Sequence, residues 1–282
     1  MSALLGWAVL PVASIAQPAS VPFRPPPHYV SGTKPDADEG SRALEELRAT
    51  GLAGGYWLEF QLRVLPRKGD ESLVQGRIFG MRGEQGPLTR LSVFGPTGAV
   101  VSSWLIRGGP QPAVWVSAAG APARQLGAVE LFQPIAGTGL TPFDLQMPFL
   151  YWPDWAYEGI AKVRGRPASS FLLYPPADLA AAHPELTAVR VALDTQFHAM
   201  VLAEFLGATG QSAKTITVLD LKKSGEQWLV KSIDLRDAAT RDKTRFEVTA
   251  AALNLTLAPE IFSPESLAGA LPPPAGVTPE KL

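Results

Sequence analysis

Apolar and polar side chains alternate along several stretches of this chain, and this alternation constrains the fold more than any other feature. In residues 56–65, YWLEFQLRVL, every second position from Leu58 onward is apolar: Leu58, Phe60, Leu62 and Val64. The positions between them, from Glu59 to Arg63, are polar. A period of two places the two sets on opposite faces of an extended segment, which is typical of a β-strand with one buried face.

Similar stretches recur along the chain at intervals of roughly ten residues, which is the spacing of short strands in an all-β protein. After 56–65 they are residues 72–82, 87–95, 99–108 and 112–118, then 157–165, 169–176, 187–194, 198–207, 214–223, 227–237 and 244–253. Polar or glycine-rich turns such as GEQG (83–86) and GPTG (95–98) separate neighbouring strands. We therefore expect a mainly β protein, with about 11–12 antiparallel strands in one sheet curled over a core.

Residues 128–155 interrupt this pattern. The stretch AVELFQPIAGTGLTPFDLQMPFLYWPDW lacks alternation and holds several prolines, which favours short helical pieces joined by turns. Its second half, FDLQMPFLYWPDW, is rich in aromatic residues and must be covered by other parts of the protein. A helix is also expected over residues 41–50, with Ser41 as its N-cap and Gly51 at its end.

The two ends of the sequence differ from the middle. Residues 1–19 combine an apolar run with small residues and predict a signal peptide cleaved near Ala16–Ala19, although no Lys or Arg precedes the run. Residues 20–38 read as a proline-rich linker and residues 269–282 as a proline-rich disordered tail. A single folded domain is expected between them, over residues 39–268.

Composition removes several classes of function. The net charge is −1, with 25 basic and 26 acidic residues, which argues against nucleic-acid binding. The chain has no cysteine, so thiolate metal sites and cysteine nucleophiles are excluded. His28, His183 and His198 have no partner at metal-ligand spacing, and each is interpreted as a surface or turn residue. Neither a phosphate-binding loop nor a serine nucleophile motif is present. We expect no enzyme activity, no metal and no cofactor.

Asp144 is a carboxylate that lies among apolar neighbours in TPFDL. It is interpreted as a helix cap or as a hydrogen-bond acceptor in a nearby turn. A hydrolase of cell-envelope polymers is the alternative, and it requires Asp144 to lie near a second carboxylate or His198 in an open cleft.

The end of the domain carries a recognisable series of residues. A strand with a tryptophan leads to a polar hairpin, then to a Lys-Thr strand, an asparagine and a closing Phe-Ser-Pro-x-x-Leu. The residues are Trp228, Ile233, Lys243, Thr244, Asn254, Phe262, Ser263, Pro264 and Leu267. This series resembles the C-terminal signature of the LolA-like outer-membrane lipoprotein-sorting proteins, in their poorly characterised branch. The insert FDLQMPFLYWPDW and the strand VRVALD are also similar to that family.

The resemblance implies a strongly curved, incomplete antiparallel β-barrel, LolA/LolB-like, with a helical plug or lid. It also implies a non-enzymatic, monomeric periplasmic carrier that binds lipoprotein acyl chains or another lipid in an apolar cavity. Such a carrier takes its cargo from an inner-membrane transporter and transfers it toward the outer membrane. The ligand-binding residues expected in the cavity and plug are Phe143, Leu145, Met147, Phe149, Leu150, Trp152, Leu58, Phe60 and Leu62.

Two alternatives stay open at this point. The aromatic residues of the insert are either a movable surface for a ligand or permanent core, and both interpretations bury the same side chains. If they are permanent core, the protein is better interpreted as a cell-envelope scaffold with a fully packed curved sheet.

Overall fold

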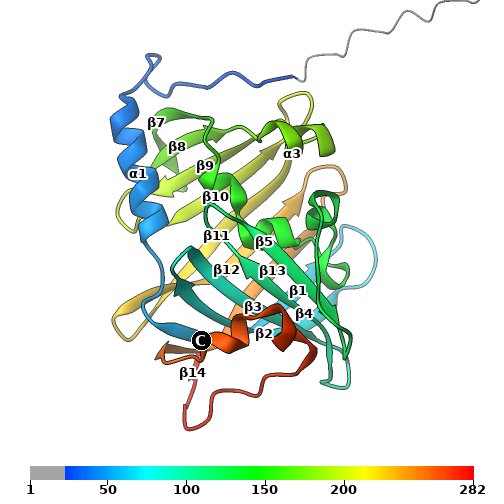
Figure 1. The fold of residues 1–282 in the computed structure, drawn as a ribbon. Helices are drawn as coiled ribbons and strands as arrows, with labels where there is room; N and C mark the ends of the chain where they lie inside the picture. The colour runs from blue at the N-terminus through cyan, green and yellow to red at the C-terminus, as the bar shows by residue number, and fades with distance from the viewer. Residues whose placement is uncertain (1–22) are drawn as a thin grey trace, which may run out of the picture.

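A computed structural model describes residues 23–282, and its main feature is one antiparallel sheet of fourteen strands. The order is β6-β5-β4-β3-β2-β1-β13-β12-β11-β10-β9-β8-β7, with β14 paired to β13. The sheet is therefore two consecutive meanders, β1 to β6 and β7 to β13, joined through β1 and β13. It curves strongly and stays open, since β6 and β7 are its two edges (Figure 1).

The elements of the first half are α1 Ala37–Ala49, β1 Gly55–Leu65, β2 Ser72–Gly83, β3 Gly86–Phe94, β4 Val100–Arg107, β5 Ala113–Ala118 and β6 Arg124–Gln125. The insert holds the short helices η1 Ala128–Phe132, η2 Ile135–Gly137, α2 Pro142–Gln146 and η3 Pro148–Tyr151. The second half has β7 Trp155–Val163, β8 Arg166–Leu173, α3 Ala177–Ala182, β9 Ala188–Asp194, β10 Met200–Leu206, β11 Ser212–Ser224, β12 Gln227–Asp237 and β13 Lys243–Leu255. The last elements are η4 Pro259–Phe262, η5 Pro264–Ala268 and β14 Glu280–Lys281.

The alternation in the sequence correctly predicts the curved sheet and its long strands. The two further strands, β6 and β14, have two residues each. A strand that short cannot show a period of two, so only its pairing with a neighbour reveals it.

The two faces of the sheet carry separate hydrophobic clusters. The main core lies on the concave face and includes Leu58, Phe60 and Leu62 of β1, as their alternation predicts. A smaller cluster on the other face contains Trp57, Phe79 and Leu105, and η4 and η5 cover it with Phe262 and Leu267. The Phe-Ser-Pro-x-x-Leu series of the sequence is therefore the segment that closes the convex side.

A buried arginine fixes this covering segment. Arg90 of β3 is 1% exposed, and its guanidinium donates to Ile261 O at 3.1 Å and to Ser266 Oγ at 2.7 Å, and also to Gly269 O. Burial lowers the pKa of Arg90 from its usual value. Among the described residues, the guanidinium is held by the backbone oxygens of Ile261 and Gly269 and by the hydroxyl of Ser266.

Glycine in β2 permits two aromatic rings of β1 to lie flat on the sheet. A side chain at Gly76 would overlap the ring of Phe60, and one at Gly80 would overlap the ring of Tyr56. Glycine inside a strand often marks such a close approach. Packing between neighbouring strands thus explains why glycine occupies positions 76 and 80 of β2.

The first described residues extend along β7 and β8 without regular structure before α1. Arg24 forms an ion pair with Asp154 at 2.6 Å, and Pro25 O accepts from the hydroxyl of Tyr174 at 2.8 Å. Helix α1 begins earlier than expected: Asp36, not Ser41, is its N-cap and accepts from Asp38 N at 3.0 Å. Ser41 was the wrong choice because Asp38 and Glu39 already continue the helix from Asp36. The predicted signal peptide lies outside the described residues.

The end of the chain also packs on the sheet. Glu280 and Lys281 form β14, opposite Ala251 and Ala250 of β13. The interpretation of residues 269–282 as a disordered tail therefore fails for the last part of that segment. Within residues 23–282 no helix has both the length and the apolar character needed to cross a membrane.

Candidate functional site

The insert between the two halves of the sheet folds as expected, into short helices over the concave face. Thr141 is the N-cap of α2 and accepts from Asp144 N, while Asp144 Oδ2 accepts from Thr141 N at 2.8 Å. Pro142 occupies the first turn of α2, and Met147 ends the helix in a left-handed conformation with φ of 47°. The N-cap is therefore Thr141, and Asp144 is the third helical residue of a capping box, where its carboxylate accepts from the backbone of the cap.

Aromatic rings from the insert gather around Phe143. Its ring centroid is 4.3 Å from that of Phe132, 6.0 Å from that of Phe149 and 6.3 Å from that of Trp152. On the sheet side, Phe205 of β10 lies 6.1 Å from Phe143 in an edge-on arrangement. Aromatic pairs with this spacing stabilise one another beyond the area they bury. Stacked and tilted rings therefore hold the insert together, and edge-on contacts of Phe143 and Phe149 with Phe205 join it to the sheet.

All nine residues expected to bind a ligand lie in or against the main core. Seven are buried, namely Leu58, Phe60, Leu62, Phe143, Phe149, Leu150 and Trp152, and the partly buried Leu145 and Met147 pack against them. Phe149 is 0% exposed. The structure thus brings the nine residues together in one cluster.

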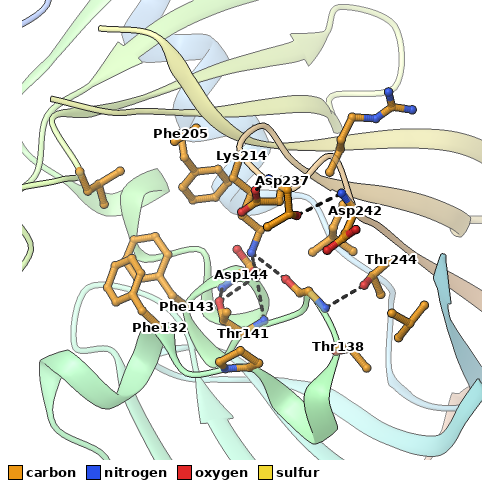
Figure 2. Close-up of a pocket in the computed structure, with 18 of the residues that line it drawn as sticks. Phe132, Thr138, Thr141, Phe143, Asp144, Phe205, Lys214, Asp237, Asp242 and Thr244 are labelled. Carbon is orange, nitrogen blue, oxygen red and sulfur yellow. Dashed lines mark hydrogen bonds and ion pairs between the residues drawn. The ribbon is translucent and has the colours of Figure 1, made fainter. Parts of the chain in front are cut away.

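A cavity of about 470 Å³ opens beside this cluster, between the insert and the ends of β10 to β13 (Figure 2). Its apolar lining consists of Val64, Phe132, Pro134, Phe143, Leu186, Phe205, Leu206, Ala213 and Leu235. Phe143 is the one residue of the predicted nine that lines it. Ligand pockets of proteins commonly have volumes of about 300–1,000 Å³ and a mainly apolar lining.

Sequence reasoning missed the other side chains of this cavity. Phe205 and Leu206 looked like ordinary strand residues, and Phe132 belongs to a helical turn with no periodicity. Only the folded chain brings these segments to the same place. The unusual concentration of aromatic residues in the insert was the available signal, and it identified Phe143 alone.

Polar groups tie the insert to the sheet at the rim of the cavity. Lys214 Nζ pairs with Asp144 Oδ2 and donates to Gly139 O at 2.9 Å. Thr244 Oγ1 accepts from Gly139 N at 2.8 Å. Figure 2 shows Lys214 and Thr244 reaching the insert from the sheet. These contacts position the insert, and they leave the apolar floor of the cavity accessible from the rim.

A second cavity, of about 340 Å³, lies between α1 and the strands beneath it. His198 lines it and pairs with Glu46 of α1 at 3.0 Å. The same helix contacts the insert through Arg48, whose Nε donates to Leu150 O at 2.8 Å. Helix α1 and the insert are thus joined as one cover over the concave face.

The hydrolase alternative fails in its His198 form, because His198 lines the other cavity. Asp237 and Asp242 do line the same cavity as Asp144, but the Asp144 side chain is 2% exposed and paired with Lys214. His183 was expected at the surface or in a turn. It ends α3 just before a turn, but it is 6% exposed, and its ring lies tilted against that of Phe132 with the centroids 3.9 Å apart. In the part of the chain that the structure describes, no group of three or more His, Cys, Asp or Glu side chains could hold a metal ion.

Comparisons with known proteins support the fold. A protein-family model described as an uncharacterized protein matches residues 179–269. No curated protein matches the sequence. Solved structures match far better in shape than in sequence.

An outer-membrane lipoprotein-sorting protein domain from Vibrio parahaemolyticus matches with a TM-score of 0.73 and 15% identity, over 83% of this chain and 100% of that one. A DUF1329 family protein from Desulfovibrio piger has a TM-score of 0.71 and 14% identity, with the same coverage of 83% and 100%. A LolA superfamily protein from Nitrosomonas europaea has a TM-score of 0.60 and 14% identity, over 79% of this chain and 96% of that one. The chain therefore has the LolA-like fold, as its sequence resemblance implied.

Proposed function

We propose that this protein is a non-enzymatic periplasmic carrier that binds the acyl chains of lipoproteins, or another lipid, on the concave face of its sheet. It takes cargo from an inner-membrane transporter and passes it toward the outer membrane, acting as a monomer. The observation that carries the proposal is the apolar cavity of about 470 Å³ beside the aromatic insert. The LolA-like fold supports it, because structures with that fold include a lipoprotein-sorting domain.

The arrangement of the insert suits a ligand that the protein binds and later releases. Burial of one CH₂ group contributes about 0.8 kcal/mol, so a chain of sixteen carbons gains on the order of 12 kcal/mol gross. On this proposal, a lipid that extends beyond the existing cavity displaces Phe143 and Phe149 from the core, which exposes their rings. That cost offsets much of the gain, so the lipid is held without becoming too stable to release.

The rim of the cavity favours an amphiphile over a plain hydrocarbon. Lys214, Arg236, Asp237 and Asp242 surround an apolar floor made by Phe143 and Phe205. Charged groups at the rim stay hydrated when an acyl chain occupies the floor. A polar headgroup can therefore remain at the mouth while the tail is buried.

The scaffold alternative is favoured by one observation, the complete burial of Phe149. In that case the insert never leaves the core and the cavity is only a packing gap. The two functions differ in one measurable property, because a permanently packed sheet does not take up an acyl chain.

A direct test measures uptake of a fluorescent fatty acid by the delipidated full-length protein, with native mass spectrometry to count bound molecules. Ala213 lines the cavity and is exposed, so Ala213→Trp fills the space without disturbing the core. Ala208 is exposed on the neighbouring turn and outside the lining, so Ala208→Trp is the matched control. We expect about one lipid per chain in the wild type and in the control, and at least tenfold weaker binding in Ala213→Trp. Absence of uptake by the wild type refutes the carrier function and leaves the scaffold.

A further inference from the structure

Strands β12 and β13 separate along part of their length. They pair from Ser232 with Glu247 to Arg236 with Lys243, and the ladder stops there. The first part of β12, from Gln227 to Val230, pairs with β11 on its other side. Beyond Glu247, β13 pairs instead with β14, through Ala250 and Ala251. Beyond Ser232 and Glu247, β12 and β13 are therefore no longer paired with each other, which leaves a gap in the ladder between them.

Side chains close the outer end of this gap. Gln227, the first residue of β12, donates through Nε2 to Asn254 Oδ1 at 2.7 Å, and its Oε1 accepts from Ala53 N at 2.6 Å. The ladder at Ser232 closes the other end. The gap is thus a bounded slot in the sheet and not a frayed edge.

Residues 280–282 of the same chain occupy the slot. Leu282 N donates to Thr249 O at 3.0 Å, and Glu280 Oε2 accepts from Ser224 Oγ at 2.6 Å. The side chain of Leu282 packs against the main core of the concave face. Lys281, between them, is exposed. The slot therefore accepts an acidic residue and, two positions later, an aliphatic one. Figure 1 shows β14 beside the C-terminal end of the drawn chain.

The chemistry of the slot fits a peptide and not a lipid. A strand that has lost its neighbour leaves backbone N–H and C=O groups that need hydrogen-bond partners. An acyl chain offers none, whereas an extended peptide supplies a matching ladder, as in other cases of strand addition.

The segment that fills the slot is held weakly. β14 has two residues, and both Glu280 and Lys281 are exposed. The residues before it, 270–279, form no helix or strand. A tethered segment competes at an effective concentration of about 1 mM, so a peptide with higher affinity can replace it.

We propose that the slot between β12 and β13 is a binding site for an extended segment of a partner protein, one that carries an acidic residue two positions before an aliphatic residue. Residues 280–282 occupy the site until the partner displaces them. This site is separate from the lipid cavity, and its existence does not depend on the carrier function.

The test uses the full chain and a labelled peptide with the sequence of residues 276–282, GVTPEKL. Leu282→Asp places a charge against the core, so it releases the tail and empties the slot. We expect this variant to bind the peptide at least tenfold more tightly than the wild type, in fluorescence anisotropy. When the peptide is added to Leu282→Asp, hydrogen exchange should show that amides in residues 248–252 regain protection. The control peptide GVTPEKD should bind at least tenfold more weakly than GVTPEKL.

A second, milder variant tests the proposal even if Leu282→Asp misfolds. Glu280→Ala removes the contact with Ser224 and leaves Leu282 in place, so it should improve peptide binding by a smaller factor. Three outcomes overturn the proposal: equal binding of GVTPEKL and GVTPEKD, no gain in either variant while thermal unfolding stays cooperative, or a concentration-dependent dimer of the wild type in sedimentation. The last result would assign the slot to the tail of a second copy.

Discussion

Replacing Phe149 with alanine distinguishes between two interpretations of the insert, a ligand-binding plug and permanent core. Phe149 is 0% exposed and packs edge-on against Phe205 at 5.8 Å. Removal of a buried phenyl ring typically costs about 3–5 kcal/mol, from lost transfer free energy and from the cavity left behind. The new space adjoins Phe143 and therefore the existing cavity of about 470 Å³.

If the concave face binds acyl chains, a lipid fills the enlarged cavity and restores part of the lost stability. At a ligand concentration 100 times the dissociation constant, linkage predicts about 2.7 kcal/mol of added stability. The assay is urea unfolding of Phe149→Ala with and without dodecanoic acid, compared with the wild type.

Phe79→Ala is the matched control. Phe79 is 7% exposed and lies in the cluster on the convex face, away from the cavity. It should lose a similar free energy of unfolding and regain none of it with dodecanoic acid. Equal responses of the two variants to the lipid would refute the reasoning, because the insert would then be ordinary core.

Three further changes test other parts of the structure. Arg90→Met leaves the acceptors Ile261 O and Gly269 O without their donor and should cost about 2–3 kcal/mol, with faster proteolysis after residue 258. Thr141→Ala removes the cap of α2 and should cost about 1 kcal/mol in thermal unfolding, whereas Thr141→Ser should cost less. The pKa of Asp194 is lowered because, although burial would raise it, hydrogen bonds from Arg166 and from two backbone amides outweigh burial. Its stabilisation is therefore complete above the carboxyl's unfolded pKa of about 3.9 and is lost as the pH falls through the lower folded pKa. The stability difference between wild type and Asp194→Asn should shrink from pH 7 to pH 3, and a constant difference would contradict this.

Much of the fold follows from local patterns. The alternation in residues 56–65 determines both that β1 is a strand and which of its side chains face the core, because a period of two admits only one division into faces. The lack of alternation and the prolines in residues 128–155 likewise determine that the insert is built of short helices. Thr141, Pro142 and Asp144 encode the start of α2 within four consecutive positions.

Contacts between distant segments were decided only by the tertiary structure. The cavity needs Phe132 from the insert, Phe205 from β10 and Val64 from β1, and no local pattern relates their positions. The slot filled by Glu280 and Leu282 depends on where the pairing of β12 and β13 stops. Periodicity reports which face of a segment is buried, whereas the identity of what covers that face depends on the packing of the whole chain. The sequence therefore determined that Phe143 and Phe149 are buried, and the fold decided that they lie over the concave face beside an open cavity.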